Sequence, residues 1–331
     1  MLRACAALGG SRALTADAKE KLPMNILVVG ATGYVGSHVA RALMTDGHEV
    51  TGLVRDPDKS RKLQGDGLKT IMGDVDSLDE MAGDFDGLVF AAQLAHEHEA
   101  VVVEKILRSF AGRDKAFVFT SGTAVLSQTT GGDWSEDTFA EQSEFEPQPM
   151  VVTRCATERL IRAAADRLRT IIIRPPLVWG NGGSRHVPYV VDSIGRTGSA
   201  CYIGAGLNLY SHVHIEDLAN LYCLAIAKGI SGAVYHAVAG EENFRTIADA
   251  VAGVAGCSTR SISLAEAGEI WGDYPARIMF NVCSRSQARR SRAELGWSPR
   301  HCDLIRDIRL GSYRDLAAMA SRSAGEMVST T

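Results

Sequence analysis

The stretch "ILVVGATGYVGSHVARAL" (residues 26–43) decides the fold. Its first four residues are apolar and mostly β-branched, which is typical of a buried strand, and the later apolar residues recur at helical spacing. Gly30, Gly33 and Gly36 lie where the strand would pass into the helix. Gly30 allows a tight turn, Gly33 lets the backbone approach a ligand, and Gly36 lets helix and strand pack closely.

In this position the three glycines predict a dinucleotide-binding turn. The amino end of a helix carries unpaired N–H groups and a partial positive charge, so a pyrophosphate binds well there. The alternative is that the glycines serve only turn geometry and packing. The order strand, glycine turn and helix favours the dinucleotide interpretation.

Outward from this unit, short apolar runs alternate with longer amphipathic segments. The segments 34–47, 56–64 and 96–112 read as helices. Apolar strands separated by helices predict an α/β fold, a doubly wound parallel sheet with both faces covered. The expected strands are 25–30, 49–54, 69–73, 87–92, 116–121 and 170–175.

After Pro175 and Pro176 the pattern changes to glycine-rich loops and isolated elements. We expect a strand and helix over 211–229, a helix over 244–255, and a long loop over 271–297. These would form a smaller substrate-binding cap over the carboxyl ends of the strands, where ligands bind in such sheets.

The predicted organisation has four parts. Residues 1–23 form a leader that we expect to be disordered, with import into an organelle as an alternative role. Residues 24–175 form the nucleotide-binding core, and residues 176–315 form the cap, interleaved with the core. Residues 316–331 form a tail, and we expect its last part, residues 321–331, to be frayed.

Composition limits the class of protein. The 331 residues are 46% hydrophobic and 22% charged with a net charge of -4, which suits a globular protein and gives no basic footprint for nucleic acid. The seven cysteines are scattered without a Cys-x-x-Cys pair, so we expect neither disulfides nor a thiolate zinc site. No apolar run reaches about 18 residues, and we expect a cytoplasmic protein without a membrane span.

The spacing Gly-x-x-Gly-x-x-Gly resembles that of the extended and atypical short-chain dehydrogenases/reductases, a superfamily that includes NAD-dependent epimerases and dehydratases. Further motifs match in order, including "IMGDV", "VFAAQ", "FTSGTAVL", "RPPLVWG" and "HVHIEDLANL", so that the resemblance covers residues 24–310. It implies a Rossmann fold that binds NAD(P). The residues it implies at the cofactor are Gly30, Thr32, Gly33, Tyr34, Val35, Gly36, Asp74, Val75, Ala91, Ala92, Arg154 and Pro176.

Arg55 ends the second strand, where a member that prefers NAD carries an acid for the ribose 2′-hydroxyl. A guanidinium suits a 2′-phosphate instead, so we predict NADP(H) in preference to NAD(H). The alternative is a solvated basic turn in which Arg55, Lys59, Arg61 and Lys62 are partly offset by neighbouring acids.

The family's catalytic residues are missing. The resemblance implies a serine after strand five and Tyr-x-x-x-Lys on the next helix, and this chain has Gly122, Met150 and Arg154 at those positions. No tyrosine occurs between Tyr34 and Tyr189, so the catalytic tyrosine is absent from its helix.

Several residues could replace the missing set. Arg154 could still hold the nicotinamide ribose, although a surface ion pair with Glu158 explains it equally well. Ser121 and Thr123 could donate to a carbonyl, or could be structural hydroxyls. His186 and Tyr189, which follow strand six, are the candidate proton donors from the cap; the alternative is a loop histidine and a packing aromatic.

The remaining histidines carry less signal. His96 and His98 read as solvated residues at a helix start. Tyr210, His212 and His214 alternate along an expected strand and would point to one face. No histidine has metal-ligand spacing with carboxylates or thiols, so we predict no metal site.

These residues favour an NADP-dependent oxidoreductase acting on a small carbonyl, alcohol or conjugated substrate. A nucleotide-sugar epimerase or dehydratase is one alternative, and a non-catalytic NADP(H)-binding sensor is another. The resemblance also implies a possible homodimer through the segments 96–111 and 150–167.

Overall fold

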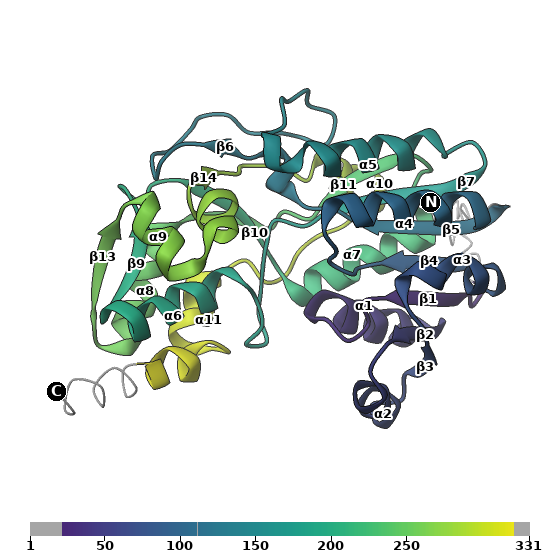
Figure 1. Cartoon of the computed structure of the whole chain (residues 1–331), viewed down its shortest axis with the longest axis horizontal. Coiled ribbons are helices and arrows are strands. Elements are labelled where there is room, and N and C mark those ends of the chain that lie inside the picture. Colours follow the sequence, from purple (N-terminus) through teal and green to yellow (C-terminus); the bar gives the residue numbers. More distant parts are fainter. Residues whose placement is uncertain (1–21, 111, 321–331) are drawn as a thin grey trace, which may run out of the picture.

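The computed structural model describes residues 22–110 and 112–320. It has a large core and a smaller cap, which Figure 1 shows side by side. Most of the expected leader and the whole segment expected to be frayed, residues 321–331, lie outside the described residues. Residues 314–320, which include the start of the expected tail, are helical, and Ala317 is fully buried.

The core is a seven-stranded sheet in the order β11-β7-β5-β4-β1-β2-β3, with all neighbours parallel. This confirms the predicted doubly wound sheet. The order reverses at β1, so a crevice opens between the carboxyl ends of β1 and β4. The strands are β1 (Asn25–Val29), β2 (Glu49–Val54), β3 (Lys69–Met72), β4 (Gly87–Phe90), β5 (Gly112–Thr120), β7 (Leu168–Arg174) and β11 (Ala233–His236).

Both faces of the sheet are covered, as a fully apolar β1 requires. Ile26 and Val28 point to one face and Leu27 and Val29 to the other, and all four are buried in separate hydrophobic clusters. One face packs against α1 (Tyr34–Thr45), α2 (Pro57–Gly65), α7 (Ile215–Lys228) and α10 (Arg289–Leu295), and the other against α3 (Leu78–Met81), α4 (His96–Ser109) and α5 (Val152–Ala163).

Helices α4 and α5 pack against each other along one side of the core. Their outer surfaces expose Val101, Val152 and Leu160. A homodimer through these helices stays a prediction.

The cap has its own hydrophobic cluster and three small sheets, β12-β10-β8, β13-β9 and β14-β6. The expected helix over 244–255 is confirmed as α8 (Phe244–Ala255). The other cap elements are β6 (Gln128–Thr129), β8 (Leu177–Trp179), α6 (His186–Thr197), β9 (Ser199–Ile203), β10 (Leu209–His214), β12 (Gly240–Asn243), β13 (Ser258–Ile262), α9 (Leu264–Trp271), η5 (Pro275–Phe280), β14 (Val282–Cys283) and α11 (Leu304–Leu310).

The chain passes between core and cap more than once. The predicted strand and helix over 211–229 are β10 and α7, but only β10 belongs to the cap, because α7 packs on α1 in the core. The expected loop over 271–297 is wrong: it contains the π-helical turn η5, strand β14 and helix α10. Buried Ile278, Phe280 and Val282 fix that segment in place.

No described helix is both long enough and apolar enough to cross a bilayer.

Candidate active site

The turn after β1 requires its glycines. Gly30 has φ of +88°, and a Cβ there would lie 2.7 Å from the backbone nitrogen of Ala92 at the end of β4. A Cβ on Gly36 would lie 2.1 Å from the carbonyl oxygen of Gly30. Gly30 therefore supplies a left-handed turn against the neighbouring strand, and Gly36 brings α1 into contact with the turn.

The amino end of α1 is open to a ligand. Gly33 is its N-cap, and no side chain caps the helix. The first N–H groups of an α-helix have no partner within the helix, so those of α1 can bind an anion. The glycine turn and the uncapped helix together fit a dinucleotide pyrophosphate.

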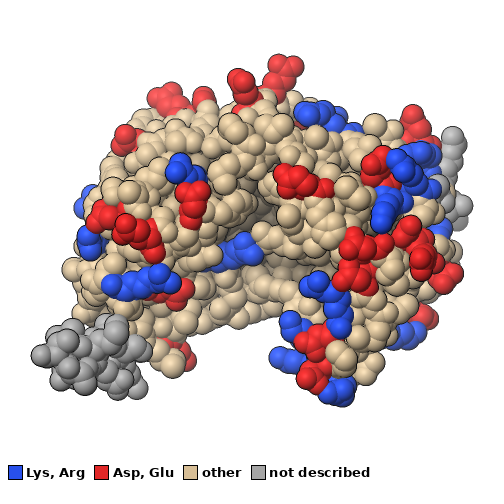
Figure 2. Space-filling view, in the orientation of Figure 1, with Lys and Arg blue, Asp and Glu red and all other residues tan. Residues whose placement is uncertain are grey.

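A cavity of about 940 Å³ begins at this turn and extends to the cap. Its walls are formed by the carboxyl ends of β1, β2, β4, β5 and β7 and by cap residues from α6, β10 and η5. Figure 2 shows the molecule hollowed between core and cap, with mostly uncharged walls. Cavities of this size and position bind small molecules and cofactors.

The cavity brings together most of the predicted cofactor residues. Gly36 does not line it, because it lies against the turn. Asp74 does not line it either: it accepts a hydrogen bond from the N–H of Asp76 and forms an ion pair with Arg55 at 3.7 Å. The predicted residues in the wall are Gly30, Thr32, Gly33, Tyr34, Val35, Arg55, Val75, Ala91, Ala92, Arg154 and Pro176.

The end of the cavity beside β2 is basic. Arg55 and Lys59 line it together with Asp56, and the side chain of Arg55 is 75% exposed. Its ion pair with Asp74 is long and solvated, so it holds the guanidinium weakly. Arg55 is therefore free to turn toward a ligand phosphate.

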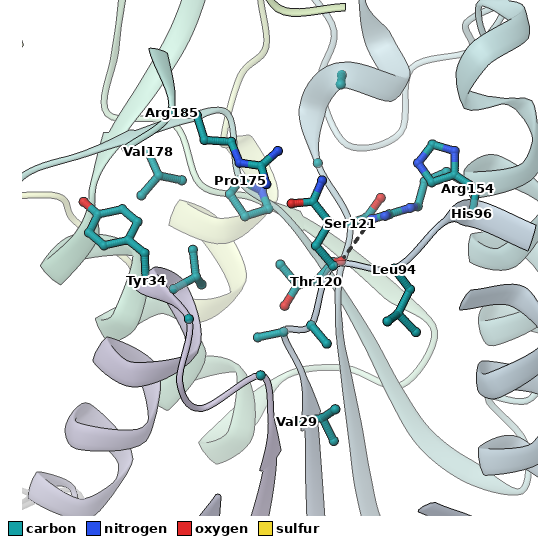
Figure 3. Close-up of a pocket in the computed structure, with 18 of the residues that line it drawn as sticks. Val29, Tyr34, Leu94, His96, Thr120, Ser121, Arg154, Pro175, Val178 and Arg185 are labelled. Carbon is teal, nitrogen blue, oxygen red and sulfur yellow. Dashed lines mark hydrogen bonds between the residues drawn. The ribbon is translucent and has the colours of Figure 1, made fainter. Parts of the chain in front are cut away.

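Arg154 lines the part of the cavity wall beside His96, apart from Arg185, and its guanidinium is held by residues behind the wall. Its Nε lies 2.9 Å from Oε1 of the fully buried Glu99, in an ionic contact whose orientation does not form a hydrogen bond. Its Nη1 donates to the carbonyl oxygen of Thr120 at 3.3 Å, the bond drawn in Figure 3. The alternative of a surface pair with Glu158 is wrong, since Glu158 pairs with the buried Arg174.

Burial perturbs the acid of this pair. Mainly through burial, which the charge of Arg154 partly offsets and the nearby Glu158 reinforces, the pKa of Glu99 is raised to about 7. Glu99 therefore changes charge near neutral pH.

The predicted hydroxyls separate into one that meets the cavity and one that does not. Ser121 lines the cavity, and its Oγ is buried without a hydrogen-bond partner among the described residues. Thr123 is fully buried outside the cavity wall and interacts with the Ser284 hydroxyl, so the structure separates it from the site. Met150, at the position of the missing tyrosine, is also outside the wall and 38% exposed.

The two predicted donors from the cap also differ. His186 lines the cavity, but burial lowers its pKa to about 3, so its ring is neutral at neutral pH. Tyr189 does not line the cavity; its ring meets Phe280 edge-on, and its carbonyl oxygen accepts a hydrogen bond from Trp271.

The sequence did not identify His96 as a site residue. Its side chain is half-buried and lines the cavity beside Arg154, as Figure 3 shows, so the expectation of a solvated residue is wrong. Burial and then the charge of Arg154 lower its pKa, while Glu97 and a hydrogen bond with the backbone of Met150 raise it. His98 matches the expectation, because it is exposed and pairs with Asp76. The motif "HEHE" carried no signal that distinguished the two histidines.

Of the histidine strand, only Tyr210 reaches the cavity. His212 accepts a hydrogen bond from the Trp179 indole, and His214 packs on the same indole. The ligand atoms of His214, Glu216 and His301 lie within 4.8 Å of one another, a grouping away from the cavity that the spacing did not reveal.

Comparison of the chain with known proteins leads to the same conclusion as the geometry of the glycine turn. The model of the NAD dependent epimerase/dehydratase family matches residues 26–238. The chain belongs to this family. The resemblance inferred from the sequence is confirmed.

Three relatives extend the comparison. An uncharacterised protein of Schizosaccharomyces pombe is 32% identical, over 88% of this chain and 100% of that protein. A 4-hydroxy-2-methyl-3-oxo-4-farnesyl-3,4-dihydroquinoline-1-oxide ketoreductase of Stigmatella aurantiaca is 28% identical, over 64% of this chain and 67% of that one. A 2-alkyl-3-oxoalkanoate reductase of Stenotrophomonas maltophilia is 26% identical, over 63% and 67%.

Solved structures of family members share the fold. A dTDP-glucose 4,6-dehydratase from Bacillus anthracis in complex with NAD has a TM-score of 0.70 at 14% identity, covering 92% of this chain and 99% of that one. A putative epimerase from Burkholderia cenocepacia has a TM-score of 0.69 at 17% identity, covering 90% and 99%. At such identities the likeness concerns the fold alone.

Proposed function

We propose that this epimerase/dehydratase-family protein is an NADP(H)-dependent reductase or dehydrogenase of small, mostly apolar carbonyl compounds and their alcohols. The observation that carries the proposal is the continuity of the cavity. It runs from the uncapped amino end of α1 to the unpartnered hydroxyl of Ser121. A cofactor seated on α1 and a substrate oxygen near Ser121 would therefore share one enclosed space.

The residues of the chain fit the cofactor at three points. The first turn of α1 would bind the pyrophosphate, and Arg55 would bind the 2′-phosphate through charge-assisted hydrogen bonds. Arg154 would donate to the nicotinamide ribose, since Glu99 and Thr120 fix its guanidinium at the cavity wall. When bound, the nicotinamide supplies or accepts the hydride.

The chain itself must stabilise the substrate oxygen. A buried hydroxyl without a partner is costly, so Ser121 Oγ is available to donate to that oxygen. A guanidinium is a poor proton shuttle, so Arg154 does not serve as the proton donor.

The proton would come from His96. Its ring lines the cavity wall beside Arg154 and contacts the backbone of Met150, the residue at the tyrosine position. Imidazole exchanges protons near neutral pH, so it can take the tyrosine's part at a moderate cost in rate.

Two relatives support oxidoreduction over epimerisation. The names of the Stigmatella and Stenotrophomonas proteins are those of a ketoreductase and a 3-oxoalkanoate reductase. Reduction of an oxo group needs one hydride and one proton, which the cofactor and the residues above can supply.

The test has two stages. NADPH binding is measured first by the fluorescence of the reduced nicotinamide. NADPH consumption is then followed against a panel of ketones, 3-oxo acids and quinones. We expect tighter binding of NADPH than of NADH and turnover with at least one class. Binding without any turnover would favour a sensor, and lack of affinity for both dinucleotides would overturn the proposal.

A further inference from the structure

The cap end of the cavity carries one positive charge and no negative charge. Arg185 lines it, and the only acid among the described lining residues, Asp56, lies at the far end beside Arg55. No described carboxylate pairs with Arg185, and no described residue forms a hydrogen bond with its guanidinium. Figure 3 shows the side chain extending over Pro175 into the cavity.

The loop that presents Arg185 is fixed from both sides. Tyr34 of α1 donates a hydrogen bond to the carbonyl oxygen of Gly180 at 2.7 Å, and the N–H of Gly180 donates to the Tyr313 hydroxyl at 2.8 Å. Tyr313 in turn donates to the carbonyl oxygen of Gly183. The backbone that carries Arg185 is therefore fixed in place, while its exposed side chain keeps the freedom to reach a ligand.

A second polar group at this end lacks a partner. His186 is 8% exposed, and its Nε2 is buried without a hydrogen bond among the described residues. Its ring is held by Tyr210, with centroids 5.1 Å apart, and by Phe244 and Phe280. Buried polar atoms are rarely left unpaired, so a ligand atom is the expected partner of Nε2.

The remaining walls at this end are apolar. Ile278 and Met279 from η5 and the ring of Tyr274 line the space beside Tyr210. Methionine adapts to irregular chains, and π-helical turns are frequent at functional sites. The combination of one cation, one buried imidazole and an apolar wall fits a small anion with a hydrocarbon chain.

We propose that the substrate is an oxo acid with an apolar chain. Its carboxylate binds the guanidinium of Arg185, and the second polar contact of this carboxylate at the cap is with Nε2 of His186. The inference rests on the proposed function, since it names the substrate class for that site. A carboxylate matches the planar fork of a guanidinium. With one cation present, a monoanion is favoured over a phosphate dianion.

The test measures binding without turnover. Octanoate and octanamide, which differ in charge and not in length, are titrated into the protein loaded with NADP⁺. We expect octanoate to bind at least tenfold more tightly than octanamide. The variant Arg185→Gln should weaken octanoate binding about 10- to 100-fold and leave octanamide unchanged, as expected for loss of a charge-assisted hydrogen bond.

Matched variants separate the possible outcomes. Arg196→Gln removes the same charge from the exposed last turn of α6 and should change nothing. His186→Phe keeps the ring packing and removes Nε2, and it should weaken octanoate binding by a smaller factor. Equal binding of octanoate and octanamide, or no octanoate binding, overturns the inference. If the protein still binds NADPH in that case, the proposed function stands. A loss of NADPH affinity in Arg185→Gln would place this cation on the cofactor and also overturn it.

Discussion

The buried pair of Glu99 and Arg154 makes a quantitative prediction about pH. In the folded protein the pKa of Glu99 rises from its ordinary value of 4.5 to about 7, mainly through burial. Because the folded pKa is the higher one, this group contributes stability that is fully present below pH 4.5 and lost as the pH rises through 7. At about 1.4 kcal/mol per pH unit, the loss is about 3 kcal/mol.

The variant Glu99→Gln cannot titrate and should not show this loss. The assay is urea unfolding of both proteins at pH 5 and pH 8, where about 2.5 kcal/mol of the difference should appear. Glu104→Gln is the matched control, because Glu104 is an exposed acid of the same helix and pairs with Arg108. If the wild type and Glu99→Gln lost the same unfolding free energy between pH 5 and pH 8, the claim that Glu99 titrates while buried would be refuted.

Three further predictions concern ligands. Gly36→Ala should abolish measurable NADPH binding, because the added Cβ would lie 2.1 Å from the carbonyl oxygen of Gly30. Gly253→Ala in α8 is the control: its Cβ meets no atom within 4 Å, so this variant should bind NADPH as the wild type does. Arg55→Ser should weaken NADPH binding at least tenfold and leave NADH binding within about twofold, and equal losses would exclude a 2′-phosphate contact. His96→Phe should lower kcat for carbonyl reduction about 100-fold without changing NADPH affinity, while His98→Phe should not. In the wild type the reduction rate should fall as the pH rises through the pKa of His96, which burial and the charge of Arg154 lower from that of a free imidazole, and a flat profile would contradict its role.

Local patterns were sufficient for the core. The apolar run of β1 has both faces buried, and the positive φ of Gly30 and the close approach of Gly36 are the conformations that the glycine spacing predicted. Such features depend on residues within one strand-turn-helix unit, and their physical causes are local. The helix over 244–255 was predicted from its local pattern for the same reason, and the structure shows in addition that the Asn243 side chain caps it.

The partners of charged residues were not predictable. An i, i+4 rule pairs Arg154 with Glu158, but the packing of α4 on α5 brings Glu99 closer, and Glu158 turns to Arg174 on β7. Such choices depend on which helices meet, and the spacing within one helix does not contain that information.

The segment over 271–297 shows the same limit in the cap. Its glycine, proline and basic residues favour a loop, yet Trp271 stacks on Phe280 with ring centroids 4.2 Å apart, and Ile278 and Met279 line the cavity. Tertiary burial of a few large side chains overrides a weak local preference.

If His96 is the proton donor, the part of the missing tyrosine is taken by a residue of another helix. Met150 precedes α5, which begins at Val152, so the position no longer presents a side chain to the cavity. His96 and Glu99 stand three residues apart on α4 and therefore share a face, with His96 in the cavity wall and Glu99 behind Arg154. Helix α4 would thus supply both Glu99, which holds the ribose-binding Arg154, and the proton donor His96. In the family these parts belong to the lysine and the tyrosine of α5. If so, Glu99→Gln should lower NADPH affinity by loosening Arg154, and it should do so without the loss of turnover at saturating substrate that His96→Phe produces.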